Sequence, residues 1–262
     1  MPFTIATWNI NSVRLREGLV ARLLRDEGPD ILCLQECKTP VELFPSDIFT
    51  ALGYRYRVAR GQKGYNGVAI LSRLPIVDAG DQDFARLGHA RHVAARLQNG
   101  VTIHNCYVPA GGDIPDREVN AKFGQKLDYL TDLRDWARWD VPQRAILVGD
   151  LNIAPREDDV WNHKALLKIV SHTPIEVDHL EQARAAGHWV DVTRADIPQG
   201  LLYSWWSYRA PDWDTADKGR RLDHVWATPD IASAAHGSRI LRPARGWDQP
   251  SDHVPVFATF DL

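Results

Sequence analysis

The 262-residue sequence has few cysteines, no long apolar run and no excess of positive charge. Its three cysteines, Cys33, Cys37 and Cys106, are an odd number without zinc-like spacing, so we expect reduced packing residues in a reducing, cytoplasmic compartment. No apolar run approaches the ~20 residues of a membrane span, and a strand-like run already begins at residue 3, so neither a signal peptide nor an anchor is expected. The formal net charge of −3 disfavours a tight, sequence-independent nucleic-acid binder.

A short apolar run at residues 145–148 leads into a group of polar side chains. Gly149 closes this run, and Asp150 and Asn152 follow it two positions apart. In extended backbone, side chains two residues apart point to the same side, so a carboxylate and an amide leave the end of a buried strand together. Asp and Asn also cap turns, so the pair is interpreted either as a turn or as part of a site.

The same pattern recurs along the chain. Apolar runs are followed or preceded by polar groups at five more places: 3–8 by Asn9 and Asn11, 31–34 by Gln35 and Glu36, 101–106 by Tyr107, 224–227 by Asp223, and 254–257 by Asp252 and His253. Loops gather at strand ends, and sites are built there. We therefore expect these groups to converge at one edge of a sheet.

Helical spacing predicts helices between the strands, at residues 13–26 with Ser12 as N-cap, 117–139, 158–170 and 178–186. Residues 54–74 are predicted to be a hairpin whose glycine-rich turn carries Lys63 and Tyr65. Arg14 and Arg16 lie beside Asn11 and are interpreted as more than a solvated face. No repeat or linker interrupts the chain, so residues 1–262 are predicted to form one mixed α/β domain.

The polar groups at the strand ends suit a hard cation. The set comprises four carboxylates and three amides: Glu36, Asp150, Asp223, Asp252, Asn9, Asn11 and Asn152. Oxygen ligands of this kind favour Mg²⁺, and the lack of ligating cysteines disfavours zinc. If His253 lies near Asp223, the charge pair favours an imidazolium that can bind a phosphate oxygen. This set predicts phosphodiester hydrolysis, with water activated at Asp150 and Tyr107 beside the leaving oxygen.

Seven segments together resemble one known family. They are residues 8–14 (WNINSVR), 34–38 (LQECK), 107–109 (YVP), 149–152 (GDLN), 203–209 (YSWWSYR), 221–223 (RLD) and 250–253 (PSDH). In this order the chain resembles the exonuclease III type abasic-site (AP) endonucleases of the endonuclease/exonuclease/phosphatase superfamily. The resemblance implies a four-layered α/β sandwich of two mixed sheets packed face to face, with helices outside and the site at one edge. It also implies Mg²⁺-dependent cleavage 5′ to abasic sites in duplex DNA, with 3′ to 5′ removal of nucleotides or blocking groups.

The resemblance also implies roles for single residues. Glu36 would be the principal metal ligand, with Asn9 and Asp252 nearby and Mn²⁺ able to substitute for Mg²⁺. Asp150 would position or deprotonate the water, Asn152 would hold the scissile phosphate, and Asp223 would orient His253. A second metal position at Asp150, Asn152 and His253 stays open. The predicted DNA-binding residues are Asn11, Arg14, Lys38, Lys63, Tyr65, Asn162, Trp205, Arg220 and Leu222; of these, the resemblance implies that Trp205 and Leu222 line the pocket for a flipped-out abasic sugar. The implied partner is duplex DNA with abasic sites or 3′ ends, bound by a monomer without an obligate protein partner.

Two positions depart from the family pattern. Arg220 stands where the pocket usually has a large apolar residue, and it is interpreted as a phosphate contact instead. Ala110 stands where members often place an amide near the phosphate. Both departures bear on substrate preference and neither touches the proposed metal and base set.

Two other functions remain open at this point. A related phosphoesterase acting on a non-DNA ester would need the same Glu36 and Asp150 but not the tryptophans or the Arg14 and Arg16 pair. A non-catalytic DNA-binding module would bind duplex DNA without cleaving it in Mg²⁺. The balance between abasic incision, exonuclease activity and 3′-end cleaning is not fixed by the sequence.

Overall fold

The computed structural model describes residues 2–140, 142–210 and 212–262, and within them the strands form two six-stranded sheets. The first sheet has the order β11 (Ala235–Ile240), β12 (Val256–Phe260), β1 (Phe3–Asn9), β2 (Ile31–Gln35), β4 (Val68–Ser72) and β3 (Tyr56–Arg60). The second has the order β5 (Ile76–Asp78), β6 (His92–Leu97), β7 (Thr102–Tyr107), β8 (Ala145–Asp150), β10 (Asp223–Ala227) and β9 (Val190–Asp191).

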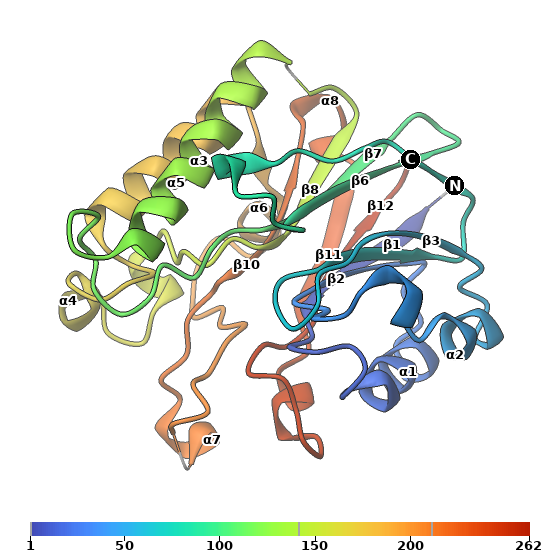
Figure 1. Ribbon diagram of the computed structural model, residues 1–262, viewed down its shortest axis with the longest axis horizontal. Coiled ribbons are helices and arrows are strands. Elements are labelled where there is room, and N and C mark those ends of the chain that lie inside the picture. The colour runs from blue at the N-terminus through green and yellow to red at the C-terminus, as the bar shows by residue number, and fades with distance from the viewer. Residues whose placement is uncertain (1, 141, 211) are drawn as a thin grey trace.

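The two sheets pack face to face, and helices cover their outer faces (Figure 1). Side chains such as Ile5, Ile70 and Val148 fill the core between the sheets. Helices α1 (Glu17–Asp26) and α2 (Ser46–Ala51) pack on the first sheet, and α3 (Ala121–Trp139) and α5 (Pro174–Ala186) on the second. Because both faces of the central strands are covered, β2, β4, β8 and β10 are buried at every position. The expected four-layered α/β sandwich is confirmed.

Short helices complete the described fold: α4 (His163–Leu166), α6 (Val192–Asp196), α7 (Trp213–Ala216) and α8 (Pro229–Ala232). The three cysteines are free and buried, as expected for packing residues. Along the described part of the chain, no helix combines the length and the apolar character needed to cross a bilayer.

Strand directions bring the predicted polar groups to one edge. The pairs β1–β2 and β7–β8 are parallel, whereas β1–β12 and β8–β10 are antiparallel. The carboxyl ends of β1, β2, β7 and β8 therefore meet the amino ends of β10 and β12. In this register Asp150 lies between Tyr107 and Asp223. The predicted convergence of strand ends is confirmed.

The start of the first predicted helix was wrong. Helix α1 begins at Glu17 rather than at residue 13, and Ser12 is not its N-cap. The Ser12 backbone has φ 84° and its N–H donates to the carbonyl of Glu36 at 2.7 Å. Val13 pairs in the same way with Cys37, at 3.2 Å. The backbone of this segment is thus tied to the loop after β2, which holds it out of the helix.

Other predicted helix bounds also need correction. Residues 158–170 are helical only at the short 3₁₀ turn Glu157–Asp159 and at α4, because buried Asp159 ties its segment to Arg194 and Arg221. Helix α3 begins at Ala121 behind the Asn120 cap rather than at residue 117. Helix α5 begins at Pro174, four residues earlier than predicted, behind a capping box. The predicted hairpin is confirmed as β3 and β4.

Candidate active site

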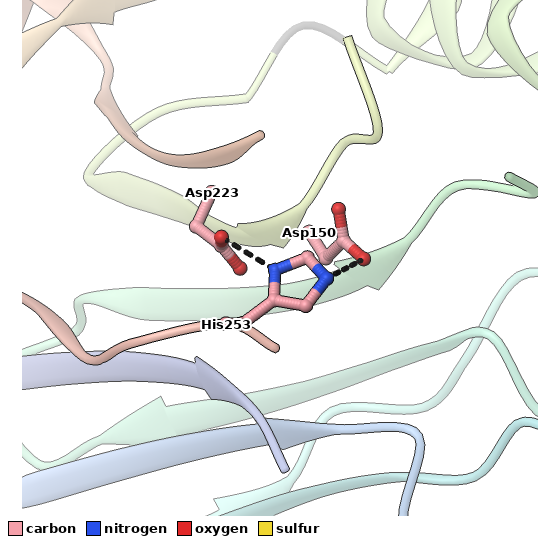
Figure 2. A group of neighbouring side chains, drawn as sticks. All are labelled: Asp150, Asp223 and His253. Atoms are coloured by element: carbon pink, nitrogen blue, oxygen red, sulfur yellow. Dashed lines mark hydrogen bonds and ion pairs between the residues drawn. The ribbon is translucent and has the colours of Figure 1, made fainter. Parts of the chain in front are cut away.

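Two aspartates and a histidine form the buried centre of the edge (Figure 2). His253 Nδ1 donates to Asp223 Oδ2 at 2.8 Å, and His253 Nε2 lies 3.6 Å from Asp150 Oδ2. Asp150 ends β8, Asp223 begins β10, and His253 precedes β12, so three strand ends hold the cluster. His253 therefore lies near Asp223, which is the condition for an imidazolium at this position.

The electrostatics of these groups are mutually dependent. Burial raises the pKa of Asp150 to about 7; the His253 charge opposes this rise and the Asp223 charge adds to it. Burial would lower the pKa of His253, but the Asp223 and Asp150 carboxylates outweigh it and raise that pKa to about 10. At neutral pH the histidine is therefore an imidazolium beside an aspartate that exchanges its proton readily.

Asp150 and Asn152 lie together through a tight turn rather than through extended backbone. Asn152 has φ 54°, and its N–H donates to Asp150 Oδ1 at 2.9 Å. Its side-chain amide donates to Asp150 Oδ2 at 3.0 Å and to the Val108 carbonyl at 2.8 Å. A Cβ at Gly149 would lie 1.9 Å from the Cys106 carbonyl oxygen, so this close approach of β7 and β8 requires glycine. The turn and the site are therefore the same feature.

Glu36 and its hydrogen-bond partners form the second part of the site. Tyr107 donates its hydroxyl to Glu36 Oε1 at 2.5 Å, and Lys38 Nζ lies 2.7 Å from Glu36 Oε2. Burial would raise the pKa of Glu36, but the Lys38 charge and the donated hydrogen bonds outweigh it and hold that pKa below its usual value. The Asn9 amide donates to Glu36 Oε1 at 3.1 Å and to Asp150 Oδ2 at 2.9 Å. One amide thus links Glu36 with Asp150.

The donor set fits a hard divalent cation. Partly exposed Glu36 and buried Asp150 and Asp223 gather negative charge, and Asp223 Oδ1 has no hydrogen-bond partner among the described residues. Ligand atoms of Asp150, Asp223 and His253 all lie within 4.8 Å of one another. Asp252 stands beside this group, where Trp205 Nε1 donates to it at 3.0 Å. Carboxylate and amide oxygens of this kind suit Mg²⁺ or Mn²⁺.

The predicted DNA-binding side chains divide by exposure. Arg14, Lys63 and Asn162 are exposed, and Tyr65 is 72% exposed. Asn162 also caps α4, where its side chain accepts from the Ala165 N–H.

The remaining predicted DNA-binding side chains lie closer to the catalytic edge. Asn11 accepts a hydrogen bond from Lys38 Nζ at 2.6 Å, so these two side chains are already engaged with each other. Trp205 packs against Leu222, beside Asp252.

Arg16 does not lie on a solvated face, in agreement with its interpretation, but its contacts are internal to the fold. Its side chain is buried, and its Nε donates to the Gln249 carbonyl at 2.9 Å. Its Nη2 donates to the Tyr208 hydroxyl at 3.1 Å. Arg16 therefore holds two loops together, whereas its neighbour Arg14 is exposed.

Sequence reasoning missed the buried support beneath the site. Lys126 Nζ donates to the Asn152 carbonyl at 2.8 Å and to Glu176 Oε1 at 2.5 Å, and both charged side chains are fully buried. Lys126 lies three residues after Phe123 and directly before Leu127, on the apolar face of α3. A lysine at that position is the signal that could have identified it, because lysine is almost never fully buried without a partner.

The comparisons with known proteins agree with this geometry. The Endonuclease/Exonuclease/phosphatase family model matches residues 6–253. Exodeoxyribonuclease III from Haemophilus influenzae is 28% identical over 267 residues, which cover 97% of this chain and 98% of the relative. An AP endonuclease structure from Archaeoglobus fulgidus superposes with a TM-score of 0.91 at 32% identity, covering 99% of this chain and 100% of the other.

A structure of the 3′ phosphatase NExo from Neisseria, bound to a product DNA hairpin, is also similar. It superposes with a TM-score of 0.90 at 31% identity and covers 99% of this chain and 100% of the other. In both superpositions the likeness spans 99% of this chain. The chain therefore belongs to the endonuclease/exonuclease/phosphatase family and, within it, to the exonuclease III and AP endonuclease group of DNA-repair nucleases.

Proposed function

We propose that this nuclease is a Mg²⁺-dependent phosphodiesterase of base-excision repair. It would cleave duplex DNA 5′ to abasic sites and remove nucleotides or blocking groups 3′ to 5′. The observation that carries the proposal is the contact chain Glu36–Asn9–Asp150–His253–Asp223, which joins a hard-oxygen set to a proton acceptor and a cation. The names of the exonuclease III and AP endonuclease relatives support it.

The metal would be held mainly by Glu36, with Asn9 and Asp150 beside it and Asp252 nearby; Mn²⁺ would substitute for Mg²⁺. When bound, it supplies positive charge to the phosphate oxygens. His253 would act as a cation rather than as a ligand, because a ligating imidazole must be neutral and this one has its pKa raised to about 10. A second metal ion held by Asp150, Asn152 and His253 would require the His253 imidazolium to lose its proton.

The side chains divide the reaction among them. Asp150 would accept the proton of the attacking water, a role that suits a carboxyl with a pKa near the working pH. The water oxygen bonds to phosphorus, the bond from phosphorus to the 3′ oxygen breaks, and that oxygen becomes a 3′-hydroxyl. Asn152 and His253 would donate to the phosphate oxygens. Burial raises the pKa of Tyr107 well above its usual value, so its hydroxyl keeps its proton beside the leaving oxygen.

DNA would lie across the exposed side chains around this edge. Arg14, Lys38 and Lys63 would contact phosphates, as would Asn11, Tyr65 and Asn162. Trp205 and Leu222 would line the pocket for an extruded abasic sugar, which costs less to flip than a paired base. We also infer one domain over residues 1–262, because one core joins both sheets, and a monomer that works in the cytoplasm without an obligate protein partner.

A cleavage assay tests this proposal. Wild type and Asp150→Asn would each be mixed with a duplex carrying one abasic analogue and with an intact blunt duplex, in Mg²⁺ and in EDTA. We expect Mg²⁺-dependent incision 5′ to the lesion that is lost in EDTA and in the variant, while shortening of the intact duplex measures the exonuclease share.

The matched control is Asp178→Asn, an exposed aspartate on α5 outside the site, which should cleave like wild type. No cleavage of either duplex by folded wild type would contradict a DNA substrate. Hydrolysis of small phosphoesters by the same sample would then select the non-DNA phosphoesterase, and duplex binding without any hydrolysis would select the binding module.

A further inference from the structure

Arg220 is a partly buried cation without an acidic partner. Among the described residues, no carboxylate forms an ion pair with its guanidinium. Its neighbour Arg221 is fully buried and paired: Arg221 Nε lies 2.8 Å from Asp159 Oδ1 and its Nη1 lies 2.8 Å from Asp191 Oδ2. Arg194 is paired with Asp159 in the same way. Arg194 and Arg221 are thus paired with carboxylates, whereas Arg220 is not.

The contacts of Arg220 leave part of its guanidinium free. Nη1 donates to the Val170 carbonyl at 2.9 Å and to Ser171 Oγ at 2.7 Å. The guanidinium carbon lies 5.2 Å from the centre of the Trp205 ring. Nε is buried, and among the described residues it has no hydrogen-bond partner. The loop at Val170 and Ser171 therefore holds Nη1 of the guanidinium, while Nε donates no hydrogen bond to the described residues.

Glu176, whose charge acts on Arg220, forms no ion pair with it. Burial lowers the pKa of Arg220, and the Glu176 charge is the opposing influence. The Glu176 oxygens already accept from Lys126, Ser171 and Thr173. A buried charge is costly unless it is paired, so an unpaired one that persists in a fold indicates a position where an anion binds.

Backbone pairing places Arg220 beside the catalytic edge. The N–H of Arg220 donates to the Trp205 carbonyl and the N–H of Trp205 donates to the Arg220 carbonyl, both at 3.0 Å. Trp205 in turn pairs with His253. Neighbouring extended segments lie about 4.8 Å apart, so the Arg220 backbone is about 10 Å from that of His253, within reach of an arginine side chain and a phosphate. The Trp205 backbone lies between them, and its indole Nε1 donates to Asp252 at 3.0 Å.

The Arg220 guanidinium therefore lies on the Trp205 ring, at a position where the resemblance implied a large apolar side chain. A neutral abasic sugar gains by packing on an exposed indole face, but here the guanidinium lies over that ring. A terminal phosphate monoester carries more negative charge near neutral pH than the phosphodiester of an abasic site, since its second pKa is about 6. A planar guanidinium with free N–H groups matches phosphate oxygens well.

We propose that Arg220 is a specificity-determining residue that binds the terminal oxygens of a 3′-phosphate and favours its removal over incision at an abasic sugar. This inference rests on the proposed function. In the favoured step the water oxygen bonds to phosphorus and the bond to the 3′ oxygen breaks. That oxygen takes a proton, so inorganic phosphate and a 3′-hydroxyl are released.

Relative kcat/KM on two substrates tests the inference. Wild type and Arg220→Met would be assayed in Mg²⁺ on a nicked duplex with a 3′-phosphate and on a duplex with one abasic analogue. We expect the ratio of 3′-phosphate removal to abasic incision to fall about tenfold in the variant, the usual order of loss for a hydrogen bond to a charged group. An unchanged ratio, or a ratio that rises, would overturn the inference.

Two further variants control for structure. Arg242→Met removes a guanidinium that lies over Trp206 and Trp213 and pairs with Asp214 and Asp217, outside the site, so its ratio should match wild type. Arg220→Lys keeps the charge without the planar fork and replaces the methionine variant if that variant does not fold; its ratio should fall by a smaller factor. If the Arg220→Lys ratio equals that of wild type, the planar guanidinium is not needed and the charge alone is sufficient.

A binding measurement separates this inference from the proposed function. In EDTA, fluorescence anisotropy would compare wild type and Arg220→Met on nicked duplexes ending in a 3′-phosphate or a 3′-hydroxyl. We expect wild type to prefer the 3′-phosphate and the variant to lose that preference. Equal wild-type affinity for both ends, with both substrates still cleaved in Mg²⁺, would sink this inference alone. No wild-type cleavage of either substrate would sink the proposed function instead.

Discussion

At the scale of single residues, the candidate site depends on two neighbouring groups whose pKa values move in ways that suit different tasks. Burial raises the pKa of Asp150 to about 7, so this carboxyl can take a proton from water near neutral pH. His253 has its pKa raised to about 10 by Asp223 and Asp150 against the effect of burial, so it stays a cation. Such pairs identify the acid and the base of a site.

These shifts predict a bell-shaped pH profile for strand incision. The rate should rise with pH as Asp150 loses its proton; because bound Mg²⁺ favours the carboxylate, this rise should lie below about pH 7. The rate should fall again near pH 10, where His253 loses its proton. Asp223→Asn removes the carboxylate that most strongly raises the His253 pKa, so the descending limb should move to lower pH. The measurement is kcat/KM from about pH 5 to about pH 10. A descending limb that stays in place in Asp223→Asn would show that His253 does not produce it.

Tyr107→Phe should slow incision while leaving the fold intact. The change removes one donor to Glu36 and the proton beside the leaving oxygen, and the loss of one such donor costs roughly 10²-fold in rate. Tyr54→Phe is the control, because the Tyr54 hydroxyl donates to the Pro29 carbonyl outside the site. Single-turnover incision and thermal melting would be measured for both variants. Equal rates in Tyr107→Phe and wild type would remove the hydroxyl from the mechanism.

At the scale of elements, strand ends were predictable and helix starts were not. Asn9 and Asp150 end strands and Glu36 directly follows one, and these places were predictable because a buried apolar run followed by polar residues is visible in sequence. The start of α1 depends instead on long-range backbone hydrogen bonds of Ser12 and Val13 to the loop after β2. Such contacts leave no local pattern, and tertiary structure overrides the helical spacing there.

The segment after β8 provides a stability prediction. Asp159 is fully buried between Arg194 and Arg221, and Asp159→Asn should reduce the free energy of unfolding by about 3 kcal/mol near pH 7. The change removes the carboxylate that two buried guanidinium groups share and leaves each with one weaker-placed or peripheral partner, Asp158 or Asp191. Burial would raise the pKa of Asp159, but the Arg221 and Arg194 charges hold it below its ordinary value. A lowered carboxyl pKa contributes stability above the unfolded pKa and loses it as pH falls through the folded pKa. The deficit of the variant should therefore shrink in acid.

Urea denaturation at neutral and acidic pH measures this effect. Asp158→Asn is the matched control, because Asp158 is 29% exposed and its ion pairs with Arg156 and Arg194 are longer, at 3.3 and 3.2 Å. Asp158→Asn should lower the free energy of unfolding by about 1 kcal/mol or less. Equal costs for the two substitutions would contradict a special role of the buried aspartate.

At the scale of the whole molecule, two sheets share one core and one edge. The family resemblance predicted this architecture, and the motif residues at that edge were named from sequence because each carries chemistry. The polar bridge between the sheets was not predicted: Gln35 Nε2 donates to Asn105 Oδ1 at 2.7 Å, and the Asn105 amide donates to the Leu34 and Ala69 carbonyls. Buried partners of this kind are set by packing across the molecule, as are those of Lys126.

The Mg²⁺ dependence of abasic-strand incision tests the central claim most directly: that this shared edge is a metal-dependent nuclease centre built on Glu36. Incision by wild type and Glu36→Gln would be followed across a Mg²⁺ titration, with melting temperatures to confirm that both are folded. Loss of a carboxylate ligand should raise the half-saturating Mg²⁺ concentration by about tenfold or more, and incision should recover at high Mg²⁺. Incision in EDTA, or the same half-saturating concentration in both proteins, would contradict the account.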